Sequence, residues 1–205
     1  MAGAGGIRER AGRALPAALL GLLLGIGAAP ARAGMPALTS MTVYAGRFTT
    51  NNWDDFVTQP GSIRFLDGYL LAVAPSWALV DRNPRWALES ELELVKFVGG
   101  QSQEEVDGAV SFRWRDFPRW WGVRTTAAFG IGPSWASRVP RLEQRISGGG
   151  SRRFLVYWFV EGTFSPHGWG RWDLVVRLHH RSSAYGLVAP DGGSNIPALG
   201  VRRRF

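Results

Sequence analysis

The amino-acid sequence predicts an all-β fold, an eight-stranded antiparallel transmembrane β-barrel of the bacterial outer membrane. Three observations predict it: an export signal at the start, eight runs in which apolar and polar side chains alternate, and an aromatic final residue, Phe205. The runs are roughly ten residues long, the length with which a tilted strand crosses a bilayer. Alternation with a period of two places the apolar side chains of each run on one face of the barrel wall.

Residues 1–33 are predicted to be a signal peptide. Three arginines within residues 8–13 form a basic segment, a run of apolar and small residues follows, and Ala31 and Ala33 have the spacing of a cleavage site. An uncleaved membrane anchor is the alternative, but the apolar run is short for a membrane span. The barrel is therefore expected to comprise residues 34–205, about the size of one domain.

The charge and composition of the chain indicate which classes of molecule it can bind. The chain has a formal net charge of +8 and no cysteine, and arginine supplies nearly all of the positive charge because Lys96 is the sole lysine. A basic chain can bind nucleic acid, but an exported one meets anionic lipid or lipopolysaccharide instead. We expect no nucleic acid partner, no cofactor and no metal, because no metal-ligand spacing occurs. After the predicted signal peptide, the sequence contains no apolar run of about 18 residues, so no transmembrane helix is predicted there.

The eight predicted strands are separated by clusters of Gly, Pro, Asn and Asp. They comprise residues 41–48, 63–74, 86–97, 106–115, 123–135, 153–164, 171–182 and 196–205. In the third run, Glu89, Glu91 and Glu93 share the face opposite to the leucines. We expect these carboxylates and Glu161 to lie inside the barrel, paired with arginines such as Arg177, and the apolar faces to meet lipid. A soluble, lipocalin-like barrel would have the faces reversed.

The chain end and the tryptophans support the membrane interpretation. Phe205 has apolar residues in phase with it, which resembles the C-terminal signal of outer-membrane barrels, so this strand is expected to engage the barrel-assembly machinery. Tryptophans prefer the membrane–water interfaces, and many lie at or near predicted strand ends: Trp77, Trp86, Trp114, Trp120, Trp121, Trp135 and Trp172. The alternative is ordinary aromatic core packing.

Connection lengths predict the orientation. With both termini in the periplasm, the connections at residues 49–62, 98–105, 136–152 and 183–195 face outward, and they are mostly longer than the others, as outer-membrane barrels require. The third of these carries five arginines, whose guanidinium groups suit lipid phosphates: Arg138, Arg141, Arg145, Arg152 and Arg153. A flexible, solvated loop is an equally good interpretation of that segment.

Two polar side chains interrupt the apolar face of the seventh strand. His180 and Ser182 are two residues apart, so they share a face with Trp172, Leu174 and Val176. In the predicted orientation they lie at the outer end of the strand, facing the outer leaflet. Because a serine nucleophile needs a base within hydrogen-bond reach, the pair is a candidate hydrolytic site directed at lipid.

Residues 180–186, His-Arg-Ser-Ser-Ala-Tyr-Gly, resemble the His-x-Ser-Asn-Ala-Gly motif of PagL-type lipid A 3-O-deacylases (acyloxyacyl hydrolases). The resemblance covers roughly the last quarter of the chain. It implies an eight-stranded outer-membrane barrel that hydrolyses an ester-linked acyl chain of lipid A without metal or cofactor. Ser182 would be the nucleophile and His180 the general base. The family's third catalytic residue is a glutamate; here Asn195 is the nearest equivalent, and Asp191 is a second candidate.

Three hypotheses follow. The first is an outer-membrane serine esterase that acts on lipid A or lipopolysaccharide through Ser182, His180 and Asn195. The second is a non-catalytic small outer-membrane barrel with a structural or lipopolysaccharide-binding role. The third is a soluble periplasmic barrel with an apolar ligand. The sequence leaves open whether the protein forms a homodimer.

Overall fold

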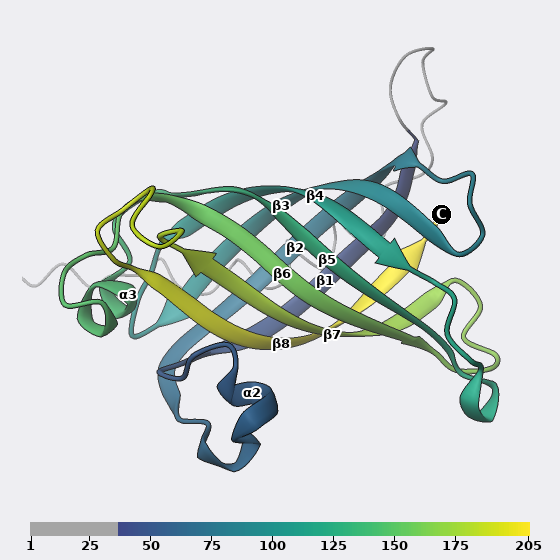
Figure 1. Cartoon of the computed structure of the whole chain (residues 1–205), viewed down its shortest axis with the longest axis horizontal. Helices are drawn as coiled ribbons and strands as arrows, with labels where there is room; N and C mark the ends of the chain where they lie inside the picture. The colour runs from purple at the N-terminus through teal and green to yellow at the C-terminus, as the bar shows by residue number, and fades with distance from the viewer. Residues whose placement is uncertain (1–36) are drawn as a thin grey trace, which may run out of the picture. The chain divides into compact units, whose positions relative to one another are not determined.

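A computed structural model describes residues 37–205; the signal peptide predicted for residues 1–33 lies outside the described residues. Residues 37–205 form one compact unit. It is a closed barrel in which each strand pairs antiparallel with the next and the last pairs with the first (Figure 1). The strands are β1 (Leu38–Thr49), β2 (Phe65–Val80), β3 (Trp86–Gly99), β4 (Glu104–Trp114), β5 (Arg124–Ala136), β6 (Phe154–Ser165), β7 (Trp172–Ser182) and β8 (Gly193–Arg204). The predicted fold class is confirmed.

All eight predicted strands are present, with two notable differences in their bounds. The second strand was expected to end before Pro75 but continues to Val80, because the β2–β3 ladder skips Ala74 and Pro75. A proline is tolerated in a strand where its missing N–H is not needed by a neighbour. β8 begins at Gly193 rather than 196, so Asn195 belongs to the strand and pairs with β7.

The barrel wall has a polar inner face and an apolar outer face. Along β7, Asp173, Val175, Arg177, His179 and Arg181 are buried, and the residues between them face outward. Exposed apolar side chains cover the outside, among them Leu94, Val110, Phe129, Ile131, Val160, Val176 and Leu199. This agrees with the predicted arrangement of a membrane barrel. Within residues 37–205, no helix has the length and hydropathy of a membrane span.

A network of ion pairs lies in the barrel interior. Arg177 donates to Glu161, Glu91 and Glu93, with Nη1 2.7 Å from Glu91 Oε1 and 3.2 Å from Glu93 Oε2. Arg113 continues the network, donating to Glu161 and to Glu89. The predicted pairing of the interior glutamates with Arg177 is confirmed for Glu91, Glu93 and Glu161, while Glu89 pairs with other arginines. Buried charges need such partners because their desolvation is costly.

The two ends of the barrel differ. The start of β1 and the end of β8 lie at one end, where the Phe205 N–H donates to Thr39 O. The other end, which we call the loop end, carries the connections at 50–64, 100–103, 137–153 and 183–192. Two short helices lie in them, α2 (Asp55–Thr58) and α3 (Arg141–Ile146), both at the same end in Figure 1. Two 3₁₀ turns complete the structure, η1 (Pro60–Ser62) and η2 (Trp120–Gly122).

The connection that carries α3 closes the loop end of the barrel. Leu142 packs in a buried cluster with Phe48, Leu70 and Phe97. Beside it, the buried carboxylate of Glu143 accepts from Arg181 Nη1 at 2.8 Å. The flexible-loop interpretation of this segment is therefore wrong for its centre, because an apolar anchor and a buried ion pair hold it in the barrel mouth.

The five arginines of that connection divide into two groups. Arg152 and Arg153 donate to backbone carbonyls, and Arg153 also lies over the ring of Trp135, 4.6 Å from its centroid. Their guanidinium groups thus support the loop itself. The other three arginines are exposed: Arg138, Arg141 and Arg145.

Candidate functional site

His180 lies on the outer face of β7, close to the loop end. Its neighbour across the ladder in β6 is Trp158, and its neighbour in β8 is Asn195. The imidazole is partly buried between them, whereas the adjacent His179 points into the barrel and is fully buried. The alternation predicted from the sequence therefore holds: His180 faces outward and His179 faces inward.

Asn195 fixes the protonation of the His180 ring. Its Oδ1 lies 2.6 Å from His180 Nδ1, and its Nδ2 donates to the backbone carbonyl of Asn51 at 2.9 Å. Because a carbonyl can only accept, the amide nitrogen must face Asn51 and the amide oxygen must face the histidine. Nδ1 therefore carries the proton in the neutral ring, and Nε2 retains the lone pair of a base.

Aromatic rings hold the other side of His180. The Trp158 ring lies against the imidazole with centroids 4.2 Å apart, and Trp53 meets Trp158 edge-on at 6.3 Å. Trp53 comes from the connection between β1 and β2, which the carbonyl of Asn51 also ties to Asn195. The connection between β1 and β2 thus supports both neighbours of His180: Trp53 packs against Trp158, and the Asn51 carbonyl accepts a hydrogen bond from Asn195.

Ser182 follows His180 on the same outer face, paired with Val156 and Gly193. Its Oγ accepts the backbone N–H of Ala184 at 3.1 Å, and no hydrogen bond within residues 37–205 joins it to His180. Because a hydroxyl can accept one hydrogen bond and donate another, the Ser182 O–H is still free to donate to a base while its oxygen accepts from Ala184.

The turn after Ser182 has an unusual backbone. Ala184 and Tyr185 both have positive φ angles, 53° and 57°, in a backbone region that residues other than glycine rarely adopt. Such strain often accompanies a functional site. The backbone amides of this turn are already engaged: that of Ser183 donates to Gly192 O, and that of Ala184 donates to Ser182 Oγ.

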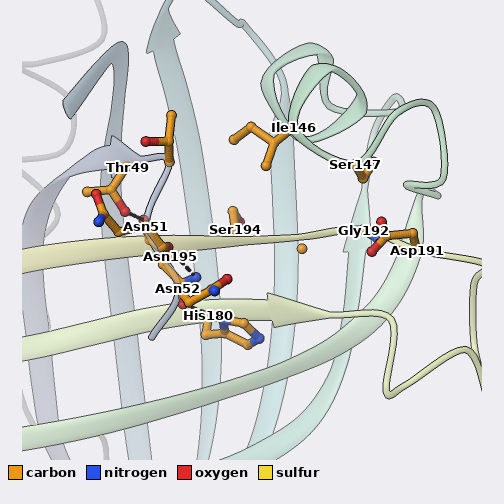
Figure 2. Close-up of a pocket in the computed structure, with 12 residues that line it drawn as sticks. Thr49, Asn51, Asn52, Ile146, Ser147, His180, Asp191, Gly192, Ser194 and Asn195 are labelled. Carbon is orange, nitrogen blue, oxygen red and sulfur yellow. Dashed lines mark hydrogen bonds between the residues drawn. The ribbon is translucent and has the colours of Figure 1, made fainter. Parts of the chain in front are cut away.

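A polar cavity of about 260 Å³ opens beside His180 (Figure 2). Backbone and side chains of three segments line it: residues 49–52, residues 146–147 and residues 191–195, together with His180. Asp191 lies in this wall, where its Oδ1 accepts the N–H of Gly192 at 2.7 Å. Of the two residues considered as partners of His180, Asn195 forms the hydrogen bond and Asp191 only lines the cavity.

Sequence reasoning missed the supporting residues. The outward position of Trp158 follows from the alternation in its strand. Its contact with His180 could therefore be predicted from the sequence if the β6–β7 register were known. Asn51 and Trp53 carried no such signal, because they lie in a connection whose path depends on what it packs against.

Comparison with known proteins supports the fold and no closer assignment. No protein-family model and no curated protein matches this sequence. The outer membrane enzyme PagL has a similar solved structure, with a TM-score of 0.53 and 14% identity over 81% of this chain and 99% of that chain. Neisserial surface protein A has a TM-score of 0.49 and 10% identity over 82% and 97%. At 14% identity the similarity to PagL shows the shared barrel fold alone.

Proposed function

We propose that the protein is an outer-membrane serine esterase that hydrolyses an ester-linked acyl chain of lipid A or lipopolysaccharide. The observation that carries the proposal is the outward-facing His180, whose Nδ1 hydrogen is held by Asn195 and whose Nε2 remains available as a base. Ser182 lies two residues further on the same lipid-facing surface. The resemblance of residues 180–186 to the deacylase motif supports the same assignment.

The proposed location follows from the barrel. Its apolar outer face suits a bilayer, and export by residues 1–33 would deliver it to the outer membrane of a Gram-negative cell, with assembly through the Phe205 strand. If the loop end faces outward, His180 and Ser182 meet the outer leaflet. Recovery of a mature N-terminus at Gly34 from membrane fractions is the expected result for this part of the proposal.

The proposed reaction has two steps. Ser182 Oγ transfers its proton to His180 Nε2 and attacks the ester carbonyl, and the proton passes to the departing alcohol oxygen. Water then gives a proton to Nε2 and attacks the acyl-serine, the C–Oγ bond breaks to release the fatty acid, and the proton returns from Nε2 to Ser182 Oγ. Asn195 keeps the ring in the required tautomer throughout. It supplies no negative charge, so the imidazolium gains less stabilisation than a carboxylate would give.

Mass spectrometry of lipid A tests the proposal. We expect cells that express the wild type to contain lipid A lacking one ester-linked acyl chain, and cells expressing Ser182→Ala or His180→Ala to retain it. Ser183→Ala is the matched control, because Ser183 is the adjacent serine and is buried; it should still remove the chain. Intact lipid A in all strains, with the barrel folded in the membrane, would contradict the proposal.

One observation favours the second hypothesis, a non-catalytic outer-membrane barrel. Ser182 Oγ is hydrogen-bonded to Ala184, not to His180, which suits a serine that closes a turn. The same lipid A experiment separates the two functions, since a non-catalytic barrel leaves every acyl chain in place.

A further inference from the structure

We propose that the barrel interior binds one divalent transition-metal ion through Glu93, Asp107 and His179. This site is separate from the outer-face site at His180 and independent of the proposed esterase activity. Glu93 and Asp107 are direct partners across the β3–β4 ladder, and His179 reaches them from β7. All three side chains have no solvent exposure.

The geometry of the three side chains suits coordination. One ligand atom from each lies within 4.8 Å of the other two. Transition-metal ions such as Zn²⁺ hold nitrogen and oxygen ligands at about 2.0–2.2 Å, which places ligand atoms around a shared ion at most about 4.4 Å apart. A small inward shift of the side chains is therefore enough to coordinate an ion.

Unsatisfied polar atoms converge on the same point. Both carboxylate oxygens of Asp107 and the Nε2 of His179 are buried without a hydrogen-bond partner among residues 37–205. The Glu105 carboxylate lies beside them, with Oε1 3.3 Å from His179 Nε2 and Oε2 3.1 Å from Arg181 Nε, so Asp107 is the carboxylate of this group with no donor among the described residues. A buried carboxylate without a donor is strongly unfavourable unless a cation or a proton balances it.

The described interior holds more carboxylates than arginines, and His179 is the one further group that can carry a positive charge there, beside Glu93 and Glu105. Apart from Asp173, the described interior buries seven carboxylates but four arginines. The carboxylates are Glu89, Glu91, Glu93, Glu105, Asp107, Glu143 and Glu161, and the arginines are Arg113, Arg177, Arg181 and Arg202. Arg177 is shared among Glu91, Glu93 and Glu161, and Arg181 between Glu105 and Glu143. Asp107 has no ion pair with any of these arginines, so the surplus negative charge falls at the proposed site.

The ligand types select the kind of ion. Two carboxylates with one imidazole suit Zn²⁺, Mn²⁺ or Fe²⁺, whereas Ca²⁺ and Mg²⁺ prefer oxygen ligands alone. Because the three residues come from three strands, the ion would join β3, β4 and β7 across the interior. The sequence shows no metal-binding spacing for the same reason, since the ligands meet only when the barrel closes.

Metal analysis of the refolded protein tests the site. Tag-free, full-length barrel is stripped with a chelator while unfolded, refolded in detergent with Zn²⁺ and dialysed, and its metal content is measured by mass spectrometry. We expect about one Zn²⁺ for each folded wild-type barrel and at least a tenfold lower content in Asp107→Asn. Refolding with Co²⁺ should give visible absorption bands of nitrogen and oxygen coordination that Asp107→Asn lacks.

Asp173→Asn is the matched control. Asp173 is also buried, but it pairs with Arg124 and Arg204, so its loss should leave the metal content unchanged. Folding of each variant is checked by the mobility shift between heated and unheated samples. Folded wild type without metal, or equal metal in Asp107→Asn, would overturn the proposal. If the folded wild type holds no metal, a melting temperature that rises at lower pH would identify bound protons as the charge that balances the buried carboxylates.

Discussion

Asn195 Oδ1 lies 2.6 Å from His180 Nδ1, and the other end of the same amide donates to Asn51 O. One side chain therefore sets the tautomer of the histidine and holds the first connection against the barrel wall. The proposed function depends on this relationship, because a histidine with its proton on Nε2 could not act as the base for Ser182.

Replacing Asn195 with leucine should slow deacylation. Asn195→Leu keeps the size of the side chain but removes the acceptor for Nδ1–H, so we expect a rate about 10²-fold lower. A time course of lipid A analysed by mass spectrometry measures it. Asn83→Leu, which changes an asparagine in the turn between β2 and β3, is the control and should retain the wild-type rate. An unchanged rate in Asn195→Leu would exclude a role for Asn195.

An aspartate at the same position should have two opposite effects. Asn195→Asp still accepts from His180 Nδ1 and adds the negative charge that stabilises an imidazolium, so we expect the rate to rise on the order of tenfold. The carboxylate cannot donate to Asn51 O, so residues 50–64 should exchange their amide hydrogens faster. Hydrogen exchange and the lipid A time course measure the two effects separately. A slower reaction would show that the bond to Asn51 matters more than the charge.

Removing the central arginine of the interior should destabilise the barrel. Arg177→Met leaves Glu91, Glu93 and Glu161 without a shared cation, a change that costs about 3–5 kcal/mol for a buried ion pair. Urea unfolding in lipid vesicles gives the free energy of unfolding. The control is Arg203→Met, on the partly exposed outer side of β8, for which we expect less than about 1 kcal/mol. Equal losses in both variants would contradict the importance of the buried network.

A charge on the outer face should oppose membrane insertion. Val160 is about half exposed near the middle of β6, so Val160→Arg should lower the free energy of unfolding in a bilayer by about 2–4 kcal/mol. Val160→Leu keeps the surface apolar and should change it little. If the arginine variant folds equally well and the protein is recovered in the soluble periplasmic fraction, the soluble-barrel hypothesis would replace the membrane one.

The sequence anticipated the strands well and the connections poorly. Alternation in β7 correctly predicted that His180 faces outward and Arg177 inward, because successive side chains of a strand must point to opposite faces. By contrast, α3 was not anticipated, since six residues carry little helical periodicity. Its position depends on Leu142 and Glu143 finding partners that earlier and later strands supply.

The sequence by itself determined the eight strands, their polar and apolar faces, and the shared outer face of His180 and Ser182, because these follow from local alternation. Only the tertiary structure decided what those side chains touch. The hydrogen bond between His180 and Asn195, the bond of Ser182 to Ala184 and the meeting of Glu93 with Asp107 and His179 depend on strand register and on the path of the turns. Those are fixed by contacts between residues far apart in the chain or by turn geometry, which a single strand pattern does not encode.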